Sequence, residues 1–206
     1  MKSPVFPLGT IPQHLYLEER LRLMKTGNFL EVGCGKGFVS KLLLDLGWSD
    51  VGYDSTKNAL IMLHLYINSK AIAEGRYRVE NQNFLSTPLS YPSKFNSIIS
   101  CMVFEHFNDD EELAYFEQAR RLLIHDGKII ILTPGCPGYW GYEDEIAGHY
   151  RRYTRDYMKT ILMSTGYRIN KLVGLTYPIS EFLVKRLEYH LRFKSKKEKT
   201  KLQSFC

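Results

Sequence analysis

Three glycines at alternate positions separate a short apolar run from an amphipathic segment. They are Gly33, Gly35 and Gly37. Residues 29–32 have strand-forming side chains broken by one acid, and apolar residues recur with helical spacing from Phe38 onward. Glycine adopts positive φ without steric penalty and lets a ligand approach the backbone closely. The pattern therefore predicts a ligand-binding turn at the carboxyl end of a strand, where open α/β sheets bind their ligands.

The spacing of these glycines differs from the dinucleotide fingerprint GxGxxG, whose last glycine would fall on Phe38. Pyrophosphate is bound by the free N–H groups of a helix N-terminus, whereas a ligand that carries an amino acid needs an anchor for its ammonium group. Glu31, two residues before the first glycine, can supply that anchor directly or through water. It can equally cap neighbouring backbone amides, and the residues alone leave both interpretations open.

Asp54 ends a second apolar run and stands about 20 residues beyond Gly35. In nucleotide-binding α/β folds, a carboxylate at this place accepts hydrogen bonds from ribose hydroxyls. A lone aspartate could also be a surface acid that starts a turn. The combined spacing of the glycines and Asp54 favours the ribose-binding interpretation.

Alternating strand and helix patterns must position these residues. Strands are expected at residues 29–32, 51–54, 77–80, 95–101, 128–133 and 167–173. Helices are expected at residues 14–25, 38–46, 55–73, 109–124, 154–164 and 179–193. The alternation predicts a doubly wound α/β sheet built from right-handed crossovers. A long loop at residues 134–153 is rich in glycine and aromatic side chains, and loops of this length in a compact domain are usually functional.

The composition fits one soluble domain. The chain has 206 residues, of which 44% are hydrophobic and 24% charged, and this length suits one sizeable core. Four cysteines lie far apart without metal-binding spacing: Cys34, Cys101, Cys136 and Cys206. They fit a reduced, cytoplasmic compartment without disulfides. No apolar run approaches the roughly 18 residues that span a bilayer, and the N-terminus lacks a secretory apolar core.

The formal net charge of +6 comes from the C-terminal end of the chain. Residues 185–201 carry eight basic and two acidic side chains, so the remainder is neutral and gives nucleic-acid binding no support. We therefore divide the chain into a domain at residues 1–178 and an amphipathic helix with a basic tail at residues 179–206. By default this helix packs on the domain; the alternative is that residues 179–201 contact an anionic membrane surface or a protein partner.

Four motifs follow one another along the chain. They are FLEVGCGKG at residues 29–37, Tyr53-Asp54, FNSIISCMVFEHF at residues 95–107 and RLLIHDG at residues 121–127. Over about residues 14–175 this order resembles the class I S-adenosylmethionine-dependent methyltransferases, of the small-molecule type that includes methyltransferase types 11 and 12. The segment HYRRYT at residues 149–154, with Gly166-Tyr167 after it, resembles a subgroup often found beside sugar and cell-surface polysaccharide genes.

The resemblance implies a Rossmann-like, doubly wound, mostly parallel α/β sheet with helices on both faces. Members of the family normally finish this sheet with an antiparallel hairpin. No strand pattern follows Pro178 in this sequence, which leaves open whether the final antiparallel strand is missing.

The resemblance also implies S-adenosylmethionine as the cofactor. The residues that it places at the cofactor are Glu31, Gly33, Cys34, Gly35, Gly37, Asp54, Ser55, Asn83, Phe84 and Cys101. By position, the glycines wrap the methionine portion and Glu31 holds its amino end. Asp54 binds the ribose.

Two residues at or near the remaining cofactor positions depart from the family pattern. Asn83 and Phe84 would flank the adenine, and Cys101 would offer its backbone to the methionine end. Both Asn83 and Asn96 stand where the family usually has aspartate. An amide at residue 83 can still accept a hydrogen bond from the adenine amino group. Asn96 is expected to be structural.

Residues with acid–base chemistry surround the expected acceptor site. Glu105 and His106 follow the fourth strand, and His149 lies in the loop of residues 134–153. Methyl transfer from a sulfonium is an in-line displacement, in which good orientation of the reactants contributes roughly 7–11 kcal/mol. A hydroxyl acceptor also gains from proton removal, for which a neutral imidazole is suited near pH 7. We hypothesise that His106 or His149 is this base; the alternative is that both only orient loops.

Two further groups admit a functional and a structural interpretation. A metal site could be built from Glu105, His106, Asp109 and Asp110. The two aspartates equally suit a helix N-terminus, so no metal is expected. Five aromatic residues of the long loop could line an acceptor pocket or simply pack the loop: Tyr139, Trp140, Tyr142, Tyr150 and Tyr153.

These patterns predict an enzyme that transfers a methyl group from S-adenosylmethionine to a small or carrier-linked acceptor, at oxygen in preference to nitrogen or carbon. One rival is a catalytically silent S-adenosylmethionine-binding module that acts through a partner. Another is an NAD-dependent oxidoreductase, which is disfavoured by Phe38 in place of a glycine and by the lack of a hydride-transfer acid. The acceptor and the oligomeric state are not specified by the sequence.

Overall fold

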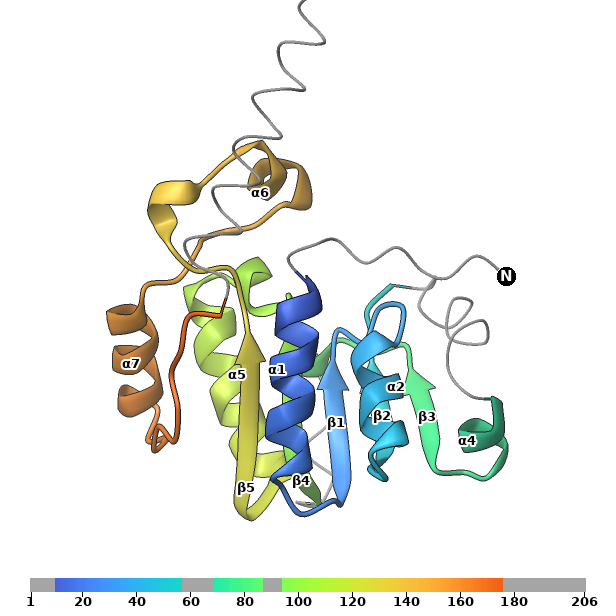
Figure 1. Cartoon of the computed structure of the whole chain (residues 1–206). Coiled ribbons are helices and arrows are strands. Elements are labelled where there is room, and N and C mark those ends of the chain that lie inside the picture. Colours follow the sequence, from blue (N-terminus) through green and yellow to red (C-terminus); the bar gives the residue numbers. More distant parts are fainter. Residues whose placement is uncertain (1–9, 57–68, 87–93, 176–206) are drawn as a thin grey trace, which may run out of the picture. The chain divides into compact units, whose positions relative to one another are not determined.

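The computed structural model of the chain describes residues 10–56, 69–86 and 94–175 (Figure 1). Residues 18–172 form one compact unit, which contains the sheet and the candidate site. Five strands pair in parallel in the order β3-β2-β1-β4-β5, as the predicted fold class requires. The strands are β1 (Asn28–Val32), β2 (Ser49–Tyr53), β3 (Tyr77–Glu80), β4 (Phe95–Cys101) and β5 (Leu123–Leu132).

β1 occupies the centre of the sheet because its apolar side chains are buried. Leu30 pairs with Val51 of β2 on one side and with Ile98 of β4 on the other, and all three are 0% exposed. Parallel strands place their carboxyl ends at one edge, where the arrowheads of Figure 1 lie together. The glycine turn, Asp54 and the residues after β4 therefore meet at the same edge.

Two helices cover opposite faces of the sheet, α2 (Phe38–Asp45) and α5 (Asp109–Leu122) (Figure 1). The other α-helices of the described residues are α1 (Thr10–Arg22), α4 (Ser69–Ala73), α6 (Tyr142–Ala147) and α7 (Arg155–Ser164). In the view of Figure 1, α2 lies in front of the sheet and α5 behind it. Of the helix predicted at residues 55–73, the structure describes residues 55 and 56, which are not helical, and residues 69–73, which form α4. The helix predicted at residues 179–193 and the basic tail lie outside them.

The strand predicted at residues 167–173 is wrong, because these residues have no regular structure. The ring of Tyr167 packs on Phe116 of α5 with 5.5 Å between centroids, and its hydroxyl donates to the Phe116 carbonyl at 2.9 Å. Arg155 of α7 donates to the Leu172 carbonyl at 3.1 Å. Side chains thus attach this segment to α5 and α7, and β5 is the last strand of the sheet within the described residues.

β5 begins earlier than residues 128–133, where it was predicted. Phe95 pairs with Leu123 whereas Ser97 pairs with Lys128, so the register shifts between them. Asp126 within this irregular stretch has a φ of 63°. Asp126 and Gly127 therefore lie in a bulge within one long strand.

The predicted loop at residues 134–153 is also partly helical. It contains one turn of 3-10 helix, η3 (Pro137–Tyr139), followed by α6. The Asp144 carboxylate accepts a hydrogen bond from Gly141 N at 2.9 Å and so caps the start of α6. Three acids in the first turn of α6 favour this start through the helix dipole.

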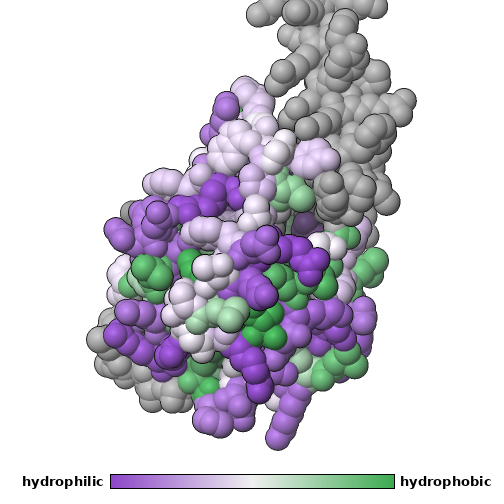
Figure 2. Space-filling view, turned by 90° about the vertical axis from the view of Figure 1, so that its left-hand side faces the viewer, coloured by the Kyte–Doolittle hydropathy of each residue, from purple (hydrophilic) through white to green (hydrophobic). Residues whose placement is uncertain are grey.

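The surface around α7 carries small hydrophobic patches separated by hydrophilic side chains (Figure 2). Met163 and Leu113 are examples of exposed apolar residues, at 61% and 49% exposure. In the part of the chain that the structure describes, no helix combines the length and apolar character needed to cross a membrane.

Candidate functional site

The glycine turn joins β1 to α2 and is held against β2. Gly33 N and Cys34 N both donate to the Tyr53 carbonyl, at 2.8 and 3.0 Å. The three glycines have φ values of 69°, 48° and 75°, a region that disfavours side chains. A Cβ added to Gly35 would meet nothing nearer than the Gly33 carbonyl at 4.0 Å. This side of the turn is open, so a ligand can approach the backbone there.

Asp54 is tied directly to the turn. One carboxylate oxygen accepts from Gly35 N at 2.8 Å, and the other accepts from Thr56 N at 2.8 Å and from the Thr56 hydroxyl. Because an ionised carboxylate offers about four acceptor positions, it can still receive a ligand hydroxyl. The structure thus brings together the two features whose spacing suggested a nucleoside site.

Glu31 is 2% exposed and belongs to a buried chain of polar groups. Its carboxylate accepts from the Ser40 hydroxyl, which lies 2.6 Å from the Tyr77 hydroxyl. Burial raises the pKa of Glu31 to about 8, against the lowering effect of the Ser40 hydrogen bonds. Burial therefore favours the neutral, protonated form of this carboxyl. A cationic ligand group beside it would favour the ionised form.

Ser40 was not singled out from the sequence. It is 0% exposed in α2, where its neighbours in the helix pattern are apolar. A small polar residue among apolar positions such as Val39, Leu42 and Leu43 is the signal that could have identified it, because a buried hydroxyl needs a hydrogen-bond partner.

The two residues predicted to flank the adenine, Asn83 and Phe84, differ in their exposure to solvent. Asn83 is exposed, and its side-chain oxygen accepts from Leu85 N at 2.9 Å. Phe84 is 3% exposed, and its ring packs on Tyr115 with 5.1 Å between centroids. The Phe84 ring belongs to the core, so any contact of residue 84 with adenine would have to come from its backbone. Asn96 accepts from Asn28 N at 2.9 Å and ties β4 to β1, which fits a structural residue.

The remaining predicted cofactor residues lie near the turn or at a strand end. Cys34 is buried within the turn, and Ser55 is exposed next to Asp54. Cys101 ends β4 and is half-buried. Burial raises the pKa of the Cys101 thiol to about 12, so this thiol stays protonated and unreactive. A role through the backbone is compatible with this environment.

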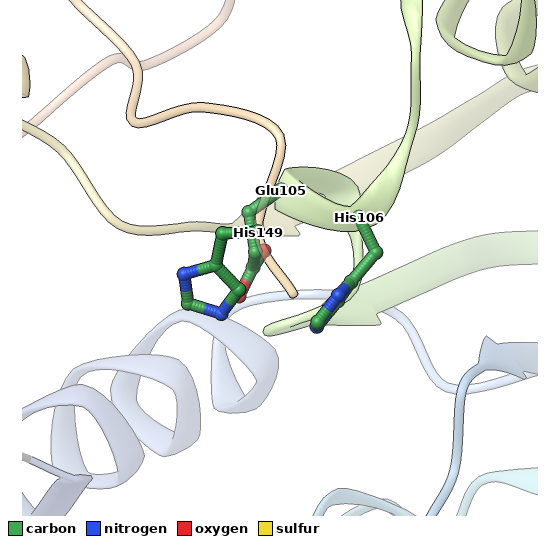
Figure 3. Close-up of side chains that lie close together, drawn as sticks. All are labelled: Glu105, His106 and His149. Atoms are coloured by element: carbon green, nitrogen blue, oxygen red, sulfur yellow. The ribbon is translucent and has the colours of Figure 1, made fainter. Parts of the chain in front are cut away.

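Glu105, His106 and His149 form a group of ionisable side chains, which we call the histidine cluster (Figure 3). One ligand atom from each lies within 4.8 Å of the others, although the histidines are far apart in sequence. The imidazole centroids are 4.8 Å apart, and the rings meet edge to face. The Tyr150 N donates to the Glu105 carbonyl at 2.8 Å, which holds the loop of His149 against the end of β4. The two histidines of the base hypothesis are thus brought together.

His149 is oriented by Asp144, a residue that the sequence analysis missed. His149 Nδ1 lies 2.9 Å from Asp144 Oδ1, and Arg152 Nε donates to the same carboxylate at 2.9 Å. Burial alone would raise the pKa of Asp144, but the hydrogen bonds from Arg152 and His149 hold it below its ordinary value. The ionised carboxylate favours a proton on Nδ1 and leaves Nε2 as an acceptor. An acid five residues before His149 in a predicted functional loop was the available signal.

The end of this loop is fixed by a buried carboxylate. Glu112 of α5 is 0% exposed and accepts from the Tyr157 hydroxyl at 2.6 Å. The Tyr153 hydroxyl lies between the Glu112 carboxylate and the Phe104 carbonyl, to which it is 2.9 Å away. Tyr153 therefore connects the loop, α5 and the turn that carries Glu105.

Replacing Tyr153 with phenylalanine should lower the free energy of unfolding by about 1–3 kcal/mol, because Glu112 then loses a buried donor. Tyr150→Phe is the matched control, since the Tyr150 side chain is 61% exposed. Urea unfolding followed by tryptophan fluorescence measures both. Equal stability of the two variants would contradict this role of Tyr153.

The aromatic residues of the loop divide into two groups. Tyr153 is 4% exposed and packs in the core, with its ring 5.4 Å from that of Phe104. Trp140, Tyr142 and Tyr150 are 40%, 62% and 61% exposed, and Tyr139 is half-buried. Packing explains Tyr153, whereas a part in an acceptor pocket stays a prediction for the other four residues.

Asp109 and Asp110 do not join the histidine cluster. They lie in the first turn of α5, which is capped by Asn108 and Glu111 in a reciprocal pair of hydrogen bonds. Asp109 also pairs with Arg151. A role at the helix N-terminus therefore explains both aspartates. Within the described residues, the group of possible metal ligands contains His149 in place of Asp109 and Asp110.

Comparison with known proteins identifies one family over most of the chain. A family model described as a methyltransferase domain matches residues 11–172, which include the glycine turn and the histidine cluster. The solved S-adenosylmethionine-dependent methyltransferase of Archaeoglobus fulgidus superposes with a TM-score of 0.57 at 16% identity, over 83% of each chain. At this identity the likeness concerns the fold.

Two curated relatives are similar over part of the chain. The sphingolipid C9-methyltransferase 1 of Gibberella zeae is 26% identical over 131 residues, which are 63% of this chain and 25% of the relative. The ubiquinone biosynthesis O-methyltransferase of Pelagibacter ubique is 26% identical over 110 residues, which are 53% of this chain and 43% of the relative. The chain thus spans less than half the length of either relative.

Proposed function

Because the chain belongs to the methyltransferase-domain family matched over residues 11–172, we propose that it transfers a methyl group from S-adenosylmethionine to a hydroxyl oxygen of a small or carrier-linked acceptor. The observation that carries this proposal is the bond from Gly35 N to the Asp54 carboxylate, which joins an open glycine turn to an acid suited to ribose. One curated relative is named as an O-methyltransferase and the other as a C9-methyltransferase, so oxygen is the finer part of the proposal.

The residues at the turn fit this cofactor. The open side of Gly35 gives a ligand access to the backbone, and the Asp54 carboxylate beside it would hold the ribose. Glu31 would hold the amino end, because its buried carboxyl can ionise in response to an ammonium group. When bound, S-adenosylmethionine supplies a methyl group on a sulfonium, and the chain contributes alignment and exclusion of water.

We place the acceptor hydroxyl at the cluster of Glu105, His106 and His149. This cluster follows β4 at the same sheet edge as the glycine turn, and the buried Glu105 and half-buried His149 keep part of it from water. His149 is the better-oriented base of the two histidines, because Asp144 holds its Nδ1 and leaves Nε2 to face the cluster. His106 has a weaker contact, 3.3 Å from Nδ1 to the Gly148 carbonyl.

His149→Gln should lower turnover at saturating acceptor by about 10²–10⁴-fold, the usual contribution of a positioned acid–base group. His106→Gln should have a smaller effect. His125→Gln is the control, since its side chain is 96% exposed. Initial rates of methyl transfer measure all three. Unchanged turnover in both cluster variants would exclude the histidines from proton removal.

The reaction itself can be tested without knowing the acceptor. The protein is incubated with methyl-labelled cofactor and fractionated cell extract, and labelled products are analysed by mass spectrometry. A small or carrier-linked product with the label on oxygen supports the proposal. Label confined to protein or RNA would overturn the small-molecule class. Cofactor binding without labelled product would favour a catalytically silent binding module.

A further inference from the structure

We propose that Glu105, His106 and His149 bind one divalent first-row transition-metal ion. These three side chains offer a carboxylate oxygen and two imidazole nitrogens within 4.8 Å of one another (Figure 3). Two imidazoles and one carboxylate suit zinc, iron, cobalt or manganese better than calcium or magnesium, which favour oxygen ligands. The proposal rests on the proposed function only for the role of the ion, and its binding can be tested separately.

The buried carboxylate of Glu105 provides the first reason. Glu105 is 0% exposed, and its Oε2 accepts from the Thr133 hydroxyl at 3.0 Å. Its Oε1 has no hydrogen-bond partner and lies 3.9 Å from His149 Nε2. A buried carboxylate oxygen without a partner is costly, and a cation beside it would remove that cost. The unpartnered atom is therefore the carboxylate oxygen that faces His149.

The orientation of the histidines provides the second reason. His149 Nδ1 is engaged by Asp144, and His106 Nδ1 contacts the Gly148 carbonyl. Metal-binding histidines commonly use one ring nitrogen for such a carboxylate or carbonyl, which directs the other nitrogen to the ion. His149 Nε2 therefore lies toward Glu105, 3.9 Å from Oε1, and the His106 ring keeps a second nitrogen that the Gly148 contact does not use.

One ligand pair already has nearly the spacing of a metal site, whereas the full set spans up to 4.8 Å and would need His106 to move closer. Two ligands at about 2.1 Å from a tetrahedral ion are about 3.4 Å apart. The 3.9 Å between Glu105 Oε1 and His149 Nε2 is close to this value. His106 is exposed, so its ring can rotate to complete the set without disturbing the core. Three protein ligands leave at least one open position, as in catalytic metal sites.

An ion at this place would change how the acceptor is activated. A hydroxyl that takes the open position would have a lower pKa, and its proton would pass to water at the exposed side of His106. His149 would then act as a ligand, and Asp144 as its positioning residue. With or without the ion, the cluster would promote loss of the proton from the same acceptor hydroxyl.

The test begins with binding of the metal alone. The full chain is stripped with a chelator, dialysed and titrated with Zn²⁺, Mn²⁺ or Co²⁺ by calorimetry, and the absorption spectrum of bound Co²⁺ reports the ligands. We expect one ion per chain. Asp144→Asn should weaken binding about 10–100-fold, as changes to partners of metal ligands do. Glu105→Gln and His106→Gln should weaken it further.

Two comparisons keep the result decisive. His125→Gln removes a histidine beside an acid at the surface and should leave binding unchanged. His106 is exposed, so His106→Gln should fold normally, which circular dichroism checks. Absence of stoichiometric binding, or equal binding by wild type, Glu105→Gln and His106→Gln, would overturn the metal site. Full methyl transfer by the metal-free protein would also overturn its role and leave the proposed function intact.

Discussion

The ligand-free protein should lose stability as the pH rises from about 5 to 8, and Glu31→Gln should remove much of this loss. The pKa of Glu31 is about 8 in the folded protein, against 4.5 as its ordinary value. Between these values the unfolded chain has released the proton that the folded chain retains. The folded state therefore binds more protons, and its stability falls with rising pH by up to about 1.4 kcal/mol per pH unit. Over this pH range the free energy of unfolding falls by a few kcal/mol in total, at most about 5.

The measurement is the free energy of unfolding from urea titrations at several pH values, with the variant subtracted from the wild type. Subtraction isolates Glu31 from the other titrating groups, provided that they are unchanged. Glu19→Gln is the control, because the Glu19 side chain is 67% exposed. If the free energy of unfolding changed with pH in the same way for wild type and Glu31→Gln, burial of Glu31 would not cause the loss of stability.

The fold and the placement of Asp54 beside the glycine turn were largely predictable because they depend on local patterns. Apolar runs and helical spacing predicted the strands and helices around residues 28–53, and the interval from Gly35 to Asp54 indicated that both would reach one sheet edge. The order of parallel strands then brings them together. Short-range patterning and one topological rule are sufficient for this part.

The partners of the functional side chains were less predictable. Ser40 reaches Glu31, and Asp144 reaches His149, only after a helix or loop has adopted its tertiary position. The strand prediction at residues 167–173 failed for the same reason. Tyr167 has strand propensity, but its packing on Phe116 of α5 determines the position of this segment. Propensity describes a residue in isolation, whereas these outcomes depend on which neighbour is within reach.

The contact of Gly33 with Val103 links the two halves of the site. A Cβ at Gly33 would lie 2.3 Å from Val103 Cγ2. Val103 directly precedes η2 (Phe104–His106), which carries two members of the histidine cluster. Because valine is stiff at χ1, it cannot easily turn away, and the backbone of η2 would have to move. The glycine turn and the η2 turn that carries Glu105 and His106 are therefore linked by a direct contact between Gly33 and Val103.

Gly33→Ala should accordingly cost about 2–5 kcal/mol of stability and weaken S-adenosylmethionine binding about tenfold or more, because left-handed backbone strain adds to overpacking. Gly75→Ala is the matched control: its φ is 67°, close to the 69° of Gly33, but an added Cβ would meet nothing within 4 Å. Backbone strain alone should cost that variant about 1–2 kcal/mol. Urea unfolding and calorimetric titration with S-adenosylhomocysteine measure the two effects.

The double variant Gly33→Ala with Val103→Ala separates strain from contact. Removing the Val103 methyl groups relieves the 2.3 Å approach but leaves the φ of residue 33 unchanged. We therefore expect ligand affinity to recover toward wild type, whereas stability recovers only in part, because Val103 also packs against the core. Turnover should recover with affinity if η2 returns to its place. Loss of affinity that persists in the double variant would mean that the turn itself, and not its contact with η2, rejects the side chain.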